Sequence, residues 1–166
     1  MTPEQLRETF KNREAIVVDD DPASGRLLAT VLRELGCVQP QVYTDPRAAL
    51  KALDARPTDV IYTDWEMHPM NGGAFIKALR ESRNAQIAQT AVIVYTGHGV
   101  KRVVDAALRA GADQFLVKPL VPMQLIQKTS HVMRKRAAKS APTLRPRALG
   151  RASALRTGGD DEVWEV

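Results

Sequence analysis

The sequence predicts an α/β domain in which five parallel strands alternate with helices. Five short runs rich in β-branched residues are separated by segments of helical periodicity, the pattern typical of βαβ units. A chain of 166 residues is long enough for one domain with a full core and an additional segment. Hydrophobic content of 44% and charged content of 26% are ordinary for a globular protein. We therefore expect one α/β domain and no second one.

The order of the predicted elements follows from these runs. We expect strands near 14–19, 39–43, 58–63, 90–95 and 114–118, and helices near 23–35, 46–55, 72–83, 99–110 and 122–138. The first of these helices has a continuous apolar stripe from Leu27 to Leu35, and Gly36 ends it, as glycine does just beyond helix C-termini. Thr2-Pro3 has the character of a helix start, which predicts a short helix over 3–11.

The domain boundaries come from changes in composition. We assign 1–12 to an N-terminal extension, 13–138 to the domain and 139–166 to a tail that is arginine-rich and then acidic. The tail contains prolines and glycines without periodicity, and such composition stays disordered unless it is bound. No acidic residue occurs between Asp113 and Asp160. This separation of charge is typical of an interaction tail.

Cellular location and redox state follow from what the sequence contains. No stretch approaches the roughly 18 apolar residues of a membrane span. The first residues lack the basic start and apolar segment of a secretory signal. A cytosolic protein is therefore expected. Cys37 is the single cysteine, so no disulfide forms within the chain, and we expect it to be inert and at least partly buried.

Polar residues follow four of the predicted strands at the point where each strand ends. Asp19-Asp20 follow the first strand, Asp64 the third, Thr96 the fourth and Lys118 the fifth. In a parallel α/β sheet, ligands bind outside the carboxyl ends of the strands. The sequence therefore predicts that two acids, a further aspartate, a hydroxyl and an ammonium meet at one edge of the sheet.

This set of residues can hold a hard cation. Mg²⁺ prefers oxygen ligands and is usually held by one or two carboxylates together with phosphate. We expect Asp20 and Asp64 to be direct ligands, Asp19 to act through water, and the backbone carbonyl of Glu66 to complete the set.

The same residues can transfer a phosphoryl group. A carboxylate can act as a covalent nucleophile, so Asp64 would attack the incoming phosphorus. Lys118 and the metal would neutralise charge on the transferring oxygens while Thr96 donates a hydrogen bond to one of them. The alternative is structural: Asp19-Asp20-Asp21 would be a helix N-cap cluster, and Asp64 a turn residue.

Five fragments, in this order and spacing, resemble the response-regulator receiver domain, especially stand-alone receivers of the chemotaxis type. They are Val17-Val18-Asp19-Asp20-Asp21-Pro22, Thr63-Asp64-Trp65-Glu66-Met67, Met70-Asn71-Gly72, Val94-Tyr95-Thr96-Gly97 and Phe115-Leu116-Val117-Lys118-Pro119, within residues 12–138. The resemblance implies a flavodoxin-like (βα)₅ fold with a doubly wound parallel sheet. It also implies phosphorylation of Asp64 by a histidine kinase and a cis peptide bond before Pro119. Such a protein is no turnover enzyme, although it catalyses its own phosphorylation and dephosphorylation with Mg²⁺.

The resemblance also implies a switch formed by Thr96 and Phe115. In this family the threonine moves toward the phosphate while an aromatic residue on the fifth strand turns inward. Phe115 lacks the hydroxyl of the tyrosine often found there, so simple core packing is the alternative. Two departures from the family pattern lie nearby: Pro69 stands one position later than usual, and Gly97 follows the threonine where alanine is common. Glu66 and His98 occupy positions whose side chains tune phosphoryl lifetime in the family.

The tail carries a second group of candidate binding residues. They are Arg145, Arg147, Arg151, Arg156, Asp160, Asp161 and Trp164. Arginine binds phosphate or guanine bidentately and stacks on flat rings, which lysine does not. The arrangement resembles the arginine-rich tail of a subset of chemotaxis-type receivers that bind cyclic di-GMP and act at the flagellar motor.

Several alternatives stay open for the function. The tail could be a basic linker whose last residues, 163–166, dock on the domain or on a protein partner. Nucleic-acid binding through the basic stretch would be salt-sensitive and sequence-blind, and no recognition helix is evident. The domain could also be a phosphorylation-independent cyclic-dinucleotide effector or a docking module. A haloacid-dehalogenase-like phosphatase would require a second aspartate where Glu66 stands, together with a cap domain.

Overall fold

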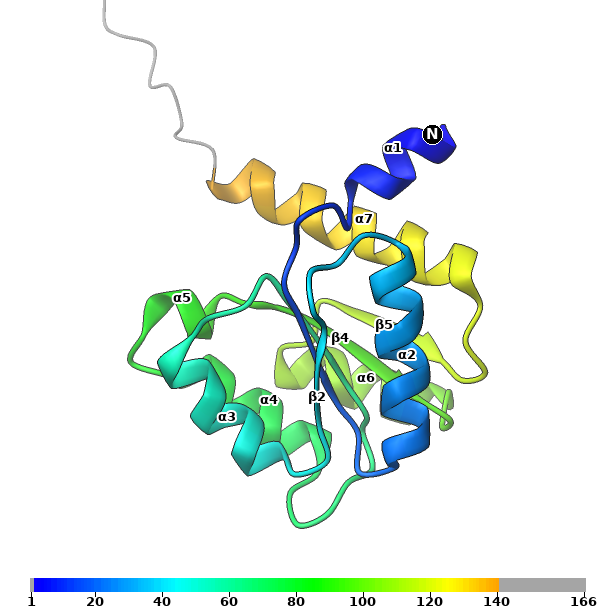
Figure 1. Ribbon diagram of the computed structural model, residues 1–166. Helices are drawn as coiled ribbons and strands as arrows, with labels where there is room; N and C mark the ends of the chain where they lie inside the picture. The colour runs from blue at the N-terminus through cyan, green and yellow to red at the C-terminus, as the bar shows by residue number, and fades with distance from the viewer. Residues whose placement is uncertain (1, 141–166) are drawn as a thin grey trace, which may run out of the picture.

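Five parallel strands form one sheet in the order β2-β1-β3-β4-β5 (Figure 1). The structure, a computed structural model, describes residues 2–140. The strands are β1 (Ala15–Val18), β2 (Gln41–Tyr43), β3 (Val60–Thr63), β4 (Ala91–Thr96) and β5 (Gln114–Val117). Every residue of β1, β3 and β4 is buried, because helices cover both faces of the sheet. Their continuous apolar runs are therefore the expected composition of central parallel strands.

Two layers of helices enclose the sheet (Figure 1). The helices are α1 (Pro3–Glu8), α2 (Pro22–Glu34), α3 (Pro46–Ala55), α4 (Gly72–Arg80), α5 (Ala85–Ala88), α6 (Lys101–Ala110) and α7 (Pro122–Ser140). Core residues of α2 and α7 pack on one face with Val17 and Tyr62. Those of α3, α4, α5 and α6 pack on the other face with Val18 and Ile61. Successive residues of a strand therefore pack into the cores on opposite faces of the sheet, as the two-residue period of a strand requires.

The predicted fold class is confirmed, and two helices end three residues earlier than predicted. The helix expected over 3–11 ends at Glu8. The helix expected over 72–83 ends at Arg80, and the short helix α5 follows it, capped by the side chain of Asn84. The predicted cis bond before Pro119 is confirmed, and the His68–Pro69 bond is cis as well. None of the helices within residues 2–140 is long and apolar enough to cross a membrane.

The N-terminal helix α1 packs against α7 as part of the same core. Leu6 is buried, and Phe10, just beyond the helix, is 1% exposed within the cluster that contains Leu28 and Val132. The hydroxyls of Thr9 and Ser130 form a hydrogen bond between the two helices. Residues 2–12 therefore close the α2–α7 side of the core.

Phe10→Ala should lower the free energy of unfolding by about 3–5 kcal/mol, because it removes a fully buried aromatic ring. Leu27→Ala is the matched control, since Leu27 is 57% exposed and its loss should change stability by no more than about 0.5 kcal/mol. Urea denaturation of the three proteins measures both values. A loss below about 1 kcal/mol for Phe10→Ala would show that α1 is dispensable.

Cys37 is buried, as predicted. Burial, reinforced by the negative charge of Asp59, raises the pKa of its thiol to about 11 from an ordinary 9.0. The thiolate is the reactive form, so the native protein should react slowly with thiol reagents at pH 8. The unfolded chain loses this proton at lower pH than the native protein. The contribution of Cys37 to stability is therefore complete below pH 9 and is lost as the pH rises toward 11.

Reaction with a chromogenic disulfide at pH 8, with and without urea, measures this protection. We expect the native thiol to react at the rate set by unfolding, and the unfolded thiol to react at once. Equal rates in the two conditions would contradict the burial of Cys37.

Candidate functional site

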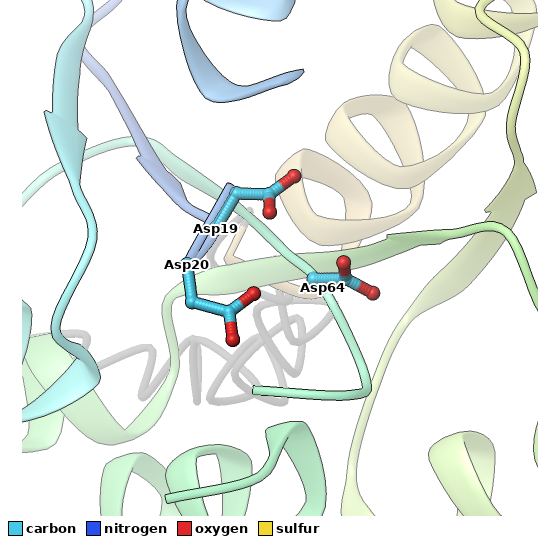
Figure 2. A group of neighbouring side chains, drawn as sticks. All are labelled: Asp19, Asp20 and Asp64. Atoms are coloured by element: carbon cyan, nitrogen blue, oxygen red, sulfur yellow. The ribbon is translucent and has the colours of Figure 1, made fainter. Parts of the chain in front are cut away.

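Three carboxylates gather at the carboxyl ends of β1 and β3 (Figure 2). Asp19 and Asp20 follow β1, and Asp64 follows β3. One carboxylate oxygen from each lies within 4.8 Å of those of the other two. Asp19 is 2% exposed, the side chain of Asp64 is 12% exposed, and Asp20 faces solvent. Two of the three negative charges are therefore largely removed from water.

Lys118 compensates the two buried carboxylates. Its Nζ atom lies 2.8 Å from Oδ2 of Asp19 and 3.1 Å from Oδ2 of Asp64. Partial burial alone would lower the pKa of the ammonium, but its hydrogen bonds and charge attraction to Asp19 and Asp64 outweigh burial and raise the pKa. Lys118 therefore stays charged, and the cluster keeps an excess of negative charge that a divalent cation can neutralise.

Tyr95 contributes to this arrangement, and the sequence analysis missed it. The Nζ atom of Lys118 lies 5.1 Å from the centroid of the Tyr95 ring, within the range of a cation–π contact. Burial raises the pKa of the Tyr95 hydroxyl, so the ring stays neutral beside the ammonium. The signal was present, because Tyr95 directly precedes Thr96 at the end of β4.

The N-cap interpretation of the aspartate run holds for Asp21 alone. The Asp21 side chain accepts a hydrogen bond from the N–H of Ala23 at the start of α2. Asp19 instead accepts from the N–H of Asp21 at 3.0 Å, and Asp20 accepts from the N–H of His68 at 3.3 Å. These bonds orient Asp19 and Asp20 toward the site while Asp21 serves the helix.

Asp64 is likewise held in place from two sides. Its Oδ1 atom accepts the backbone N–H of Trp65 at 2.6 Å, while Oδ2 faces Lys118. The loop after it depends on Gly72, where an added Cβ would lie 2.5 Å from the backbone oxygen of Asp64 and 2.8 Å from Cα of Trp65. The glycine of the Met70-Asn71-Gly72 fragment therefore allows α4 to start directly beneath Asp64, a role that the sequence analysis did not assign.

The structure places the predicted switch residues on neighbouring strands. Thr96 ends β4 and Phe115 lies on β5, where it pairs with Val94. They are 1% and 4% exposed. The Thr96 hydroxyl accepts the N–H of His98 at 3.5 Å. Phe115 packs in the core between the sheet and α3, α4 and α6, so switching and core packing both fit its position.

Glu66 and His98 face each other at the edge of the site. Nδ1 of His98 lies 3.3 Å from Oε2 of Glu66, and both side chains are more than half exposed. The predicted tail residues lie outside the described residues: Arg145, Arg147, Arg151, Arg156, Asp160, Asp161 and Trp164. The structure thus brings together Asp19, Asp20, Asp64, Thr96 and Lys118.

Comparison with known proteins identifies the class that this fold and site define. The sequence model of the response regulator receiver domain matches residues 15–130. The match covers more than half of the chain, and the chain therefore belongs to the response-regulator receiver family.

Individual relatives agree with this assignment. The chain is 33% identical over 119 residues to chemotaxis protein CheY1 of Helicobacter pylori, covering 71% of this chain and 94% of the relative. It is 31% identical over 134 residues to the sensor histidine kinase GacS of Pseudomonas protegens, covering 76% of this chain and 14% of the kinase. A solved receiver domain of sensor histidine kinase PA1611 from Pseudomonas aeruginosa, with magnesium in its active site cleft, has the same fold. It gives a TM-score of 0.67 at 20% identity, over 74% of this chain and 98% of that one.

Gly72→Ala should destabilise the protein by about 1–3 kcal/mol, because the added methyl group would overlap the backbone of Asp64 and Trp65. Gly97→Ala is the matched control, since no atom lies within 4 Å of its Cβ position. Urea denaturation compares the two variants, and equal losses for both would refute the packing role of Gly72.

Proposed function

We propose that the protein is a single-domain response regulator in which Asp64 accepts a phosphoryl group from the phosphohistidine of a histidine kinase. The observation that carries this proposal is the Asp64 carboxylate, which is 12% exposed, bonded to Lys118 and grouped with two further carboxylates. Receiver domains within sensor kinases such as GacS support a kinase partner. The proposed action is that of a phosphorylated switch in the cytoplasm, which catalyses only its own phosphoryl transfer and loss.

The transfer follows from the geometry of the site. An oxygen of Asp64 attacks the phosphorus, a P–O bond forms, and the P–N bond to the kinase histidine breaks and leaves its electron pair on the ring nitrogen. The N–H of Trp65 and the ammonium of Lys118 hold the carboxylate in one orientation. Lys118 lies beside the position of the new phosphoryl oxygens, and the buried Thr96 hydroxyl can donate to one of them. Such positioning and charge stabilisation supply most of the catalysis in phosphoryl transfer.

Mg²⁺ fits the donor set of this site. Asp20 and Asp64 would bind it directly, Asp19 through water, and the carbonyl of Glu66 would complete the oxygen set. The ion, when bound, neutralises charge on the phosphoryl oxygens. The excess of carboxylates over Lys118 supports this assignment, and so does the magnesium held by the PA1611 receiver domain.

Output by protein contact is supported by an exposed apolar patch beside the switch. Val100 at the start of α6, Val117 on β5, and Val121 and Met123 at the start of α7 are between 42% and 59% exposed. Val117 lies on the strand that carries the buried Phe115, and Val121 and Met123 follow that strand in the chain. A partner that docks here would respond to a change in the position of Thr96 or Phe115. The similarity to chemotaxis proteins such as CheY1 favours a flagellar motor protein as this partner.

Asp64→Asn should abolish phosphorylation by phosphoramidate and Mg²⁺, because the amide has no nucleophilic oxygen anion. Asp54→Asn, an exposed aspartate on α3, is the control and should be phosphorylated like the wild type. Phosphate-affinity gel electrophoresis measures the modified fraction. Full modification of Asp64→Asn would refute the proposal.

As a second activity, we propose that the tail binds cyclic di-GMP. The support is that every cation of the tail beyond Lys139 is an arginine and that Trp164 follows them, a combination that suits stacking and bidentate binding of a guanine nucleotide. Calorimetric titration of cyclic di-GMP into the full chain should give binding that Arg147→Ala or Trp164→Ala removes. Asp64→Asn should change this affinity by less than about threefold, well below the tenfold that corresponds to about 1.4 kcal/mol. Absence of heat with the full chain would leave a regulator controlled by phosphorylation alone.

A further inference from the structure

We propose that a groove at the base of the sheet binds the acidic segment of the same chain, residues 160–166. The groove has a volume of about 990 Å³. Residues of the second half of α7, of α5 and of the start of β4 line it (these elements are labelled in Figure 1). It therefore lies at the opposite end of the parallel strands from Asp64, which follows the last residue of β3. The inference is independent of the proposed phosphoryl transfer.

The groove carries an excess of positive charge. Five cations line it against two carboxylates, those of Asp59 and Asp113. The Asp113 carboxylate is already neutralised, because it lies 3.2 Å from the guanidinium of Arg80 and 2.6 Å from that of Arg136. The Asp59 carboxylate accepts the N–H of Glu14 at 2.8 Å. The groove therefore favours an anionic occupant.

The cations that remain for such an occupant lie on the outer margin of the groove. Lys135 and Lys139 are exposed on α7, and half-buried Arg13 lies across from them before β1. These three side chains form no ion pair within residues 2–140. Arg13 donates one hydrogen bond, from Nε to the carbonyl of Thr9 at 3.1 Å. Arg80 already donates four, to the carbonyls of Ala88, Thr90 and Gly111. Arg80 thus shapes the floor, while the marginal cations are available to carboxylates.

Two further donors of the lining lack partners. Nε of Arg136 and the hydroxyl of Thr58 are buried without a hydrogen bond in the described part of the chain. A buried donor without a partner costs about 1–3 kcal/mol. Neither atom is exposed to solvent, so an oxygen of an occupant would reach it only after the covering side chains move.

The wall of the groove is apolar as well as basic. Val132, Ala112 and Met133 contribute to it, and Leu108 is 45% exposed there. An occupant that combines carboxylates with bulky apolar side chains therefore fits better than a plain phosphate. Residues 160–166 read Asp-Asp-Glu-Val-Trp-Glu-Val and have this composition.

The connection of the chain favours the same occupant. Ser140, the last residue of α7, itself lines the groove, and residues 141–159 can span up to about 60 Å when extended. Because only 19 residues separate the segment from Ser140, its effective concentration at the groove is in the millimolar range. A contact with a dissociation constant of about 1 mM would then be occupied roughly half of the time.

Paramagnetic relaxation in the full chain tests the docking. A nitroxide on Thr157→Cys, in a Cys37→Ala background, leaves all acidic residues of the segment in place. We expect it to broaden the amide signals of Gln89 and Leu108 in the groove and to spare that of Lys51 on α3. Equal broadening at the groove and on α3 would overturn the proposal.

Charge reversal makes the test specific. Lys135→Glu combined with Lys139→Glu should abolish the broadening, whereas the matched pair Lys51→Glu and Lys77→Glu should preserve it. Asp160→Lys combined with Asp161→Lys should abolish it too, without any change within residues 2–140. Persistence of the broadening in both groove and segment variants would refute the pairing.

Mixing distinguishes the chain's own segment from that of a second copy. Isotope-labelled protein without nitroxide is mixed with unlabelled protein that carries it. Unbroadened signals in the mixture support docking within one chain, and broadened groove signals would show a second copy as the occupant and contradict the proposal.

Discussion

The ammonium of Lys118, held between Asp19 and Asp64, is the interaction on which the candidate site depends. It connects the ends of β5, β1 and β3, which are brought together only by the tertiary fold. Two largely buried carboxylates at this distance repel one another, and removal of a buried partner charge typically costs about 3–5 kcal/mol. Lys118 makes the cluster stable while leaving it short of positive charge. That shortage favours a divalent cation at this edge of the sheet, and such a cation would offset the negative charge of the proposed phosphoryl group.

The surrounding structure serves to hold these groups in position. Helix capping by Asp21 leaves Asp19 and Asp20 free for the site, and Gly72 brings α4 against the loop of Asp64. The fifth strand connects the site with the surface, since Phe115 and Val117 lie on it and Lys118 directly follows it. Under the proposed function, a change at the phosphoryl group would reach the exposed patch through this strand and its neighbour β4.

The opposite end of the sheet has its own polar network, and α7 belongs to both ends. Its first turn lies beside the exposed patch, while Arg136 binds Asp113 near its last turn. If the acidic segment docks at the base and a partner at the patch, both would act on one helix. Any coupling between them must then be reciprocal in binding free energy.

Features that are determined by one short stretch of sequence could be predicted, whereas features that depend on contacts between distant residues could not. The central strands were evident because burial on both faces leaves only apolar residues, and the site residues followed because parallel strands end at one edge. The packing of α1 on α7 could not be derived in this way, since it depends on residues far apart in sequence. The place of Tyr95 at the end of β4 was visible in the sequence, but the contact of its ring with Lys118 depends on the spacing of the side chains in the fold. The helix α5 was missed because its four residues are too few to show a period. The groove could not be predicted for the same reason as the contacts between distant residues, because its lining comes from many separate stretches of the chain.

Locating the phosphoryl group in the wild-type protein tests the central claim most directly. Borohydride reduction of the phosphorylated chain converts an aspartyl phosphate to homoserine, which peptide mass spectrometry assigns to one position. The account predicts homoserine at position 64 and unmodified aspartate at positions 19 and 20. Homoserine at either of those positions, or at none of the three, would contradict it.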